Sequence, residues 1–132
     1  MRPYNHTFDP PAPYLQVTVA GVMNSQQHEI VPALLDTGSD VTAVPARLAD
    51  DLHLQAIGRL HLENVEAKTT YVSTYAVRLT VASVTVPHLE TILTGLDFVV
   101  LGRDVLNDFY LLLNGPDLTF DLSTSPFISA AT

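Results

Sequence analysis

The sequence contains no cysteine and no long apolar run. Without cysteine the protein forms no disulfides and performs no thiolate chemistry, which leaves the redox compartment open. No apolar stretch approaches the roughly 20 residues that cross a bilayer, and residues 1–14 have no apolar segment of the kind that a secretory signal needs. We therefore expect no membrane partner, with the cytoplasm as the default location.

Positive charge is also scarce. Six lysines and arginines stand against 14 acidic residues, which gives a formal net charge of −8. Because binding to phosphates requires a basic surface, this balance argues against nucleic acid as a partner. It does not by itself select another partner.

Apolar residues, in contrast, make up 47% of the 132 residues, which is enough for the core of one globular domain. Four of the nine prolines lie within residues 1–13. This segment is predicted to form an extended arm that is flexible unless a partner holds it.

Alternating or β-branched segments predict about eight short strands. The clearest are residues 14–20, which alternate apolar and polar side chains, and residues 28–35, which become fully apolar toward their end. Two short helices are expected, one with Pro45 at its first position and one after Gly102. Since there is no βαβ alternation, the pattern indicates an all-β domain, either a barrel or two crossed sheets.

The most informative segment is "PALLDTGSDVTAVP", residues 32–45. An apolar run leads into Asp36, and a β-branched stretch follows the turn. An isolated Asp-Thr-Gly is usually ordinary turn chemistry, in which the aspartate bonds to its own backbone. Here, however, the carboxylate is expected at the end of a buried strand, where its ionisation is costly without partners.

A carboxylate in such a place becomes chemically useful when it meets a second one. Two carboxylates in contact share one proton, so that one activates a water while the other donates to a substrate carbonyl. The chain contains one Asp-Thr-Gly and no Asp-Ser-Gly. The pair therefore requires a second copy of the chain, and we expect a homodimer that hydrolyses amide bonds without metal or covalent intermediate.

Two motifs carry a family resemblance. They are "ALLDTGSDVT", residues 33–42, and "FVVLGRDVL", residues 98–106, with Asp36 and Gly102 separated by 66 positions. They resemble the catalytic loop and the segment behind it in retropepsins, the single-domain homodimeric aspartic proteases of retroviruses and their cellular and bacterial relatives. The resemblance covers residues 14–122 and implies a single-lobe acid-protease barrel with two short helices, acting on peptide or protein substrates. Residues 123–132 are interpreted as a C-terminal tail.

The resemblance also implies roles for the residues of the turn. Asp36 matches the catalytic aspartate, Thr37 the threonine that locks the two loops across the dimer, and Gly38 the glycine beside the substrate backbone. The Ser39 hydroxyl is expected, from its chemistry, to bond the outer carboxylate oxygen of Asp36.

Two further residues are expected to bind substrate. Asp40 matches an acid that holds the substrate backbone in viral members and pairs with the arginine after the glycine of the second motif, which is Arg103 here. Both residues follow apolar strands, and a partly buried arginine is best held by a carboxylate. We predict this ion pair; the alternative is a solvated arginine at a helix start.

The flap of the family is a hairpin that closes over substrate, and its turn should fall around residues 64–70. Viral flaps are rich in glycine, whereas residues 61–77 contain none. A stiffer flap is expected, because glycine hinges are missing from this stretch. Viral members also interleave their termini in a shared sheet, for which a proline-rich arm is poorly suited.

Two alternatives remain open. One is a dimeric peptide-binding module on the same fold with weak or no turnover, which the glycine-free flap favours. The other is a monomer in which Asp36 is only a turn acid. The five histidines show no metal-binding spacing, so neither a metal nor a cofactor is expected.

Overall fold

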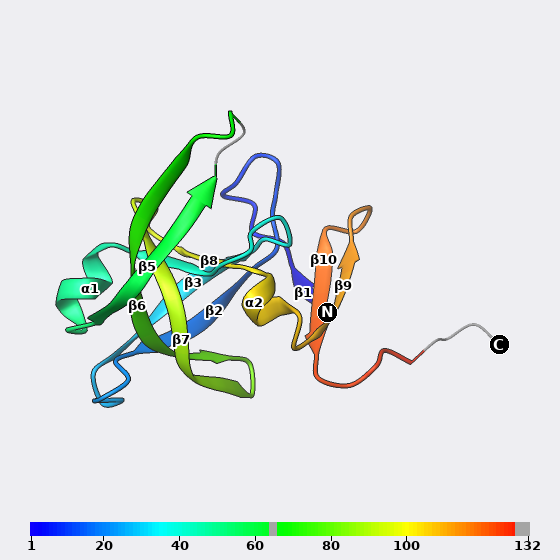
Figure 1. Ribbon diagram of the computed structural model, residues 1–132. Helices are drawn as coiled ribbons and strands as arrows, with labels where there is room; N and C mark the ends of the chain where they lie inside the picture. Colours follow the sequence, from blue (N-terminus) through cyan, green and yellow to red (C-terminus); the bar gives the residue numbers. More distant parts are fainter. Residues whose placement is uncertain (64–65, 129–132) are drawn as a thin grey trace.

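The computed structural model describes residues 1–63 and 66–128 and shows a β-barrel with a small sheet beside it (Figure 1). In chain order the elements are β1 (Arg2–Pro3), β2 (Tyr14–Ala20), β3 (His28–Leu35), β4 (Ala43–Pro45), α1 (Arg47–Asp51), β5 (Gln55–Glu63), β6 (Thr69–Val81), β7 (Val84–Thr94), β8 (Val99–Leu101), α2 (Arg103–Leu106), β9 (Tyr110–Asn114) and β10 (Thr119–Ser123). The expected all-β barrel with two short helices is confirmed.

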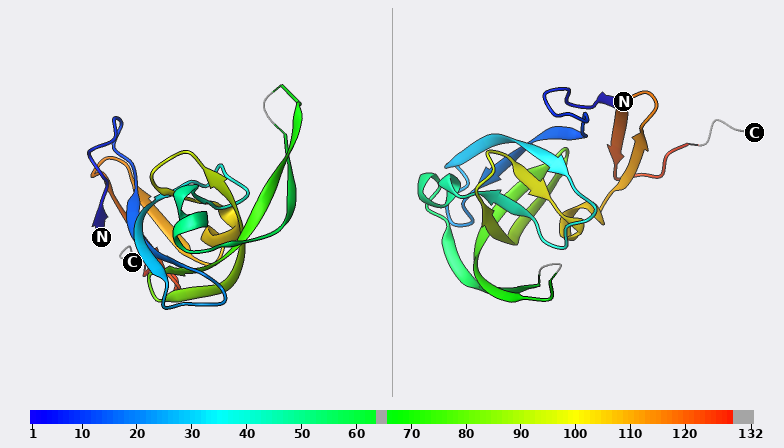
Figure 2. Two further views of the ribbon diagram at one scale, coloured as in Figure 1. Left: turned by 90° about the vertical axis from the view of Figure 1, so that its left-hand side faces the viewer. Right: turned by 90° about the horizontal axis from the view of Figure 1, so that it is seen from above.

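The barrel is closed by hydrogen bonds between its first and last strands. β2, β3, β8, β4, β7 and β6 follow one another in that order, and β6 pairs back onto β2. β5 pairs with residues 69–76 of β6, and the two strands rise from the barrel as a long hairpin (Figure 2). Closure removes free edges from these six strands, which otherwise would pair with other chains.

Branched aliphatic side chains fill the barrel because the strands present them at every second position. In β2, Leu15, Val17 and Val19 are buried while Gln16 between them is exposed. Full burial of one such side chain stabilises the fold by about 1.5–3 kcal/mol. The core therefore follows from the alternation in the sequence.

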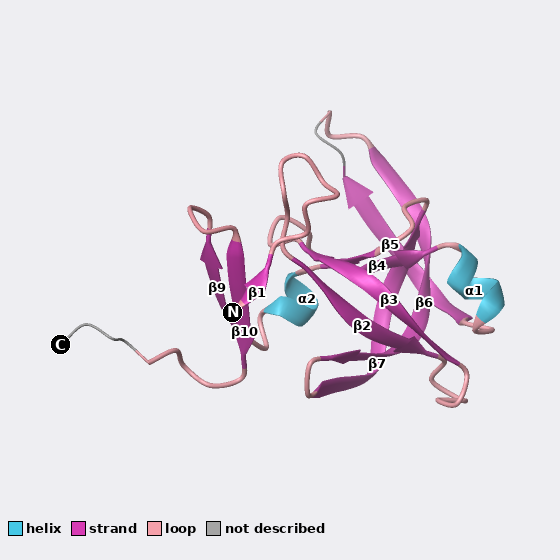
Figure 3. Cartoon of the chain, turned by 180° about the vertical axis from the view of Figure 1, so that it is seen from behind, coloured by secondary structure: helices cyan, strands magenta, loops and turns pink. Residues whose placement is uncertain are grey.

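The second sheet has the strand order β1–β10–β9 and lies at one side of the barrel (Figure 3). Its middle strand faces the barrel core with Phe120 and Leu122, of which Phe120 is fully buried. This sheet consists of the two ends of the chain, because β1 comes from the N-terminal arm and the β9–β10 hairpin follows α2.

The N-terminal arm is held by its own chain, although the sequence indicated that it would need a partner. Arg2 lies opposite Phe120 in the β1–β10 ladder. Further along, Phe8 stacks on Tyr14 with ring centroids 4.3 Å apart and meets Phe98 edge-on at 5.6 Å. These contacts attach residues 2–8 to both the small sheet and the barrel, and apolar burial offsets the entropy of ordering the arm.

One predicted helix start is wrong. Pro45 is the last residue of β4 and lies opposite Thr94 of β7, and α1 begins at Arg47. The reason is tertiary: Ala46 N donates to Thr94 O at 2.9 Å, so the backbone is still bonded to β7 where the helix was expected. The predicted flap turn around residues 64–70 lies partly outside the described residues; β5 ends at Glu63, just before it, and β6 begins earlier than expected, at Thr69. In the described part of the chain, no helix is both long and apolar enough to cross a bilayer.

Candidate active site

The position of Asp36 is set by a parallel pair of strands. Asp36 follows β3 directly, and β3 runs parallel to β8 with Leu35 opposite Leu101. Because parallel strands end at the same edge of a sheet, the two sequence motifs meet there. Asp36 N donates to Leu101 O at 3.0 Å, which ties the backbone of the acid to the second motif.

The Asp36 carboxylate is oriented by its own turn. Gly38 N donates to Asp36 Oδ1 at 2.9 Å. A Cβ atom at residue 38 would lie 3.1 Å from the same oxygen, so glycine is the residue that permits this close approach. Asp36 itself is half-buried, while Thr37, Gly38 and Asp40 are exposed. The carboxylate therefore stands at the end of a core strand in a loop that a second molecule can reach.

The Ser39 hydroxyl does not make the expected hydrogen bond to the Asp36 carboxylate. Ser39 Oγ donates to Val41 O at 2.8 Å. A serine hydroxyl has a single proton, so in this chain it cannot also donate to the Asp36 carboxylate, and that predicted bond is wrong. A role of Ser39 in substrate binding stays a prediction.

The predicted ion pair between Asp40 and Arg103 is confirmed. Arg103 Nη2 contacts Asp40 Oδ1, Nη1 donates to Thr37 O at 2.6 Å, and the Arg103 backbone N donates to Ser39 O at 2.8 Å. The Asp40 side chain is 86% exposed, so the pair contributes little to global stability. Its effect is to order the loop after Asp36, and its role in binding substrate stays a prediction.

A second clamp on the loop comes from Asp104 and Thr42, neither of which was predicted as a site residue. Thr42 N donates to Asp104 Oδ2 at 3.0 Å, and Thr42 Oγ1 donates to Asp104 Oδ1 at 2.7 Å. The same hydroxyl oxygen accepts a bond from Gly102 N at 3.1 Å. In the sequence, Asp104 reads as an acid that suits the start of a helix. The available signal in the sequence was a threonine in the β-branched stretch after the turn, where its hydroxyl would need a polar partner once buried; in the structure Thr42 is fully buried.

The β5–β6 hairpin occupies the place expected for the flap. It is free of glycine from residue 61 to residue 77, as noted above, but Gly58 lies at its base. The register of β5 against β6 shifts between Ala56 and Gly58, which marks a bulge where the hairpin leaves the barrel. The base of the hairpin is therefore a point at which it can bend.

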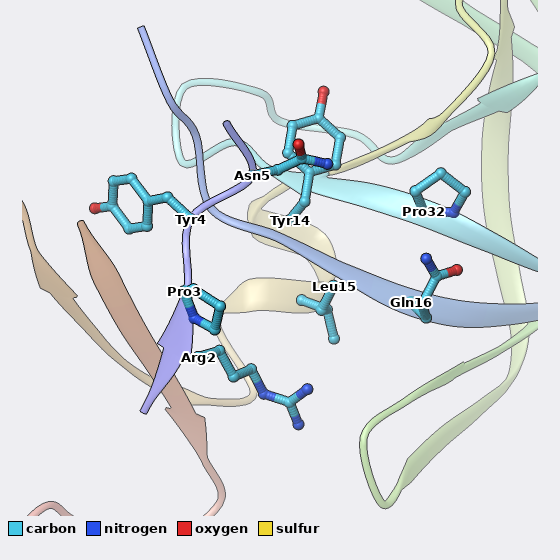
Figure 4. Close-up of a pocket in the computed structure, with 8 residues that line it drawn as sticks. All are labelled: Arg2, Pro3, Tyr4, Asn5, Tyr14, Leu15, Gln16 and Pro32. Atoms are coloured by element: carbon cyan, nitrogen blue, oxygen red, sulfur yellow. The ribbon is translucent and has the colours of Figure 1, made fainter. Parts of the chain in front are cut away.

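A hollow of about 390 Å³ lies away from these residues, between the N-terminal arm and β2–β3 (Figure 4). It is lined by Arg2, Tyr4, Gln16 and Pro32 among others, and by none of the predicted site residues. The described residues contain no group of three or more histidine, aspartate or glutamate side chains arranged to hold a metal ion.

Comparison with known families agrees with this geometry. The model of the family described as gag-polyprotein putative aspartyl protease matches residues 19–108, which is more than half of the chain. The chain belongs to this family. The match includes both Asp36 and Arg103, so the two motifs that meet at the edge of the sheet lie inside the aspartyl protease domain. No curated protein matches the chain.

Solved structures show the same fold for this aspartyl protease domain. EIAV protease in complex with an inhibitor is 17% identical, with a TM-score of 0.55 over 74% of this chain and 86% of that chain. A retropepsin-like aspartic protease from Rickettsia conorii is 15% identical, with a TM-score of 0.57 over 88% and 86%. The foamy viral protease–reverse transcriptase is 19% identical, with a TM-score of 0.54, and the match covers 73% of this chain but 12% of that one. At these identities the likeness shows the retropepsin fold.

Proposed function

We propose that this chain is one subunit of a homodimeric aspartic endopeptidase, with Asp36 of each copy as the catalytic pair. The observation that carries the proposal is the placement of Asp36. It is a half-buried carboxylate at the end of a core strand, in an open loop whose backbone is bonded to β8. Membership in an aspartyl protease family supports the same reaction. Since the chain supplies one such acid, the pair needs a second copy.

In this pair the two carboxylates hold one proton between them, because two adjacent negative charges repel. The ionised carboxylate takes a proton from a water, whose oxygen attacks the carbonyl carbon of the substrate. The protonated carboxyl donates its proton to the carbonyl oxygen. These two transfers leave a diol intermediate and one proton on the pair. When the C–N bond breaks, the nitrogen takes that proton and leaves as an amine. A hydroxyl of the diol then gives its proton to the pair as the carboxylic acid product forms, so the pair is singly protonated again.

The substrate that fits this site is an extended peptide, bound partly as an added strand under the flap. Leu60, Leu62 and Val72 are half-buried and share one face of the β5–β6 hairpin. The same face continues into the fully buried Thr74 at the base, whereas Tyr71 on the other face is 68% exposed. The apolar face is therefore turned toward the barrel, which favours peptides with apolar side chains near the cleaved bond.

The test is cleavage of a diverse peptide library by the wild type and by Asp36→Asn at several pH values. We expect cleavage by the wild type alone, with a bell-shaped pH profile centred in the acid to mildly acidic range, because one shared proton is required. Asp97→Asn is the matched control, since this carboxylate is 90% exposed and pairs with Arg47 instead, and it should cleave like the wild type. A flat profile from about pH 4 to about pH 9 would contradict the shared proton.

One result would replace the proposal. If the wild type is dimeric and binds extended peptides but cleaves none of them, the protein is a peptide-binding module on the same fold. Equal cleavage by Asp36→Asn and the wild type would show that another group performs the chemistry.

A further inference from the structure

Strand β7 changes its partner at the place where the β5–β6 hairpin leaves the barrel. Its residues 84–91 pair with β6, and its residues 92–94 pair with β4. β6 continues in the other direction, where its residues 69–76 pair with β5. Within the described residues, the backbone ladder between β6 and β7 therefore ends at Tyr75 opposite Thr91, just where the hairpin begins.

Two side chains of β7 strengthen the connection to β6 at this end of the ladder. Thr91 Oγ1 donates to Tyr75 O at 2.9 Å, and Glu90 Oε2 accepts a hydrogen bond from Thr74 Oγ1 at 2.7 Å. Because successive residues of a strand point to opposite faces, Thr91 and Glu90 hold β6 from the two faces of the sheet. Thr74 is the first residue of the hairpin beyond the end of the ladder, so the bond from Glu90 reaches the base of the hairpin itself.

The hydrogen bond matters more to Thr74 than to Glu90. Thr74 is fully buried, whereas Glu90 is exposed and water can solvate its carboxylate. A buried hydroxyl that loses its partner keeps the full cost of its desolvation. The base of the hairpin therefore depends on an acceptor that β7 supplies.

The Glu90 carboxylate also lies close to β5. Gly58 is opposite Thr74 in the β5–β6 ladder, directly after the shift in register. A Cβ atom at residue 58 would lie 3.4 Å from Thr74 Oγ1 and 3.5 Å from Glu90 Oε2. The carboxylate is thus within contact distance of both strands of the hairpin, at the bulge where the hairpin can bend.

The same stretch of β7 is bonded to the segment that follows Asp36. Ile92 N donates to Thr42 O at 3.2 Å, and Thr42 is the residue that Asp104 clamps. Glu90 is two positions before Ile92. One short segment of β7 therefore contacts both the base of the hairpin and the end of the loop after Asp36, so it fixes the position of one relative to the other.

We propose that Glu90 is a positioning residue for the flap. Through Thr74 it sets the angle at which the hairpin leaves the barrel, and with it the fit of an extended peptide between the hairpin and Asp36. This inference rests on the proposed function, in which the hairpin covers a peptide substrate. Glu90 acts as a hydrogen-bond acceptor and not as a charge, since its partner is a neutral hydroxyl.

Kinetics of peptide cleavage test the proposal with three variants. Glu90→Ala should raise KM about 10-fold and change kcat by less than about 2-fold, because a misplaced flap loses contacts that bind ground state and transition state alike. Glu90→Gln should restore the wild-type KM, since its amide oxygen accepts the same bond. Thr85→Ala is the matched control: it removes a 3.0 Å side-chain contact with Thr80 at the far end of the same ladder and should leave KM unchanged. An unchanged KM in Glu90→Ala, or an equal rise in Glu90→Gln, would overturn the proposal.

A double-mutant cycle shows whether Glu90 acts through Thr74. Thr74→Val removes the hydroxyl and keeps the shape of the side chain. If the two residues act as one unit, each single variant and the double variant should raise KM by the same factor of about 10. Independent effects would multiply to about 100-fold and would refute the route through Thr74.

Hydrogen–deuterium exchange separates this inference from the proposed activity. Amides of residues 55–63 and 69–74 should exchange about 10-fold faster in Glu90→Ala and in Thr74→Val than in the wild type, and at the wild-type rate in Thr85→Ala. Circular dichroism checks folding, and Thr74→Val gives the same comparison if Glu90→Ala does not fold. Faster exchange in a protein that cleaves no peptide would refute the catalytic proposal and retain the role of Glu90. Cleavage by the wild type with exchange unchanged in both variants would do the reverse.

Discussion

Gly102 offers the sharpest test of how the two motifs are joined. It lies between β8 and α2 with φ −90° and ψ −179°, an extended conformation that any residue adopts. What restricts this position to glycine is steric, because there is little room for a side chain. A Cβ atom would lie 2.8 Å from the carbonyl carbon of Val41, 2.9 Å from its oxygen and 3.0 Å from Asp104 Oδ1.

The substitution Gly102→Ala should therefore displace the loop that follows Asp36. To restore an ordinary contact of 3.4 Å, the backbone at Val41 must move by at least 0.6 Å. That backbone is tied on both sides, through Ser39 O to Arg103 N and through Thr42 to Asp104. We expect a loss of about 1–3 kcal/mol in the free energy of unfolding. For the proposed peptidase activity we expect a fall in kcat/KM of about 100-fold, because a displacement approaching 1 Å would misalign the Asp36 carboxylate.

The assay compares Gly102→Ala with Gly95→Ala in urea unfolding and peptide cleavage. A Cβ atom at residue 95 meets nothing within 4 Å and its φ is not positive, so this control should be neutral or stabilised by about 0.4–1 kcal/mol. If the two variants match in stability and in kcat/KM, the close contact between the motifs does not constrain the loop and the reasoning is refuted.

Two further predictions concern other contacts. Asp104→Ala removes both carboxylate oxygens that accept hydrogen bonds from the buried Thr42, and it should lower the free energy of unfolding by about 1–2 kcal/mol. Asp104→Asn keeps one of these acceptors and should lower it by less. Equal losses for the two variants in urea unfolding would argue against the clamp. Burial raises the pKa of Tyr14 to about 12 from 10.0. The unfolded chain therefore loses this proton first, and stability that is complete below pH 10.0 should fall by about 2–3 kcal/mol as the pH rises to about 12. Tyr14→Phe should remove this part of the alkaline loss, and an unchanged pH dependence in the variant would contradict it.

Much of the fold is encoded in local patterns. The alternation in residues 14–20 and the apolar end of residues 28–35 predicted β2 and β3 with their observed bounds. These bounds were predicted accurately because a strand places an apolar side chain on its buried face at every second residue, a pattern that a few neighbouring residues reveal. The Asp-Thr-Gly turn likewise predicted a carboxylate at the end of a core strand, because its glycine and its polar side chains act within a few residues.

The errors arose where distant segments decide local structure. Pro45 is suited to the first position of a helix, but β7 continues to bond the backbone as far as Ala46. The arm looked unattached because nothing in its own sequence indicates that β10 pairs with it or that Tyr14 stacks on Phe8. Such contacts depend on which surfaces the folded barrel leaves open.

The sequence by itself thus determined most of the strands and the acid with its turn, and it led to the proposal that a second copy supplies a second acid. Only the tertiary structure decided how the acid is held. The parallel pairing of β3 with β8 brings Asp104 to Thr42 across 62 positions. The physical reason is that periodicity and turn chemistry act over a few residues, whereas strand partners are chosen by the burial of whole faces.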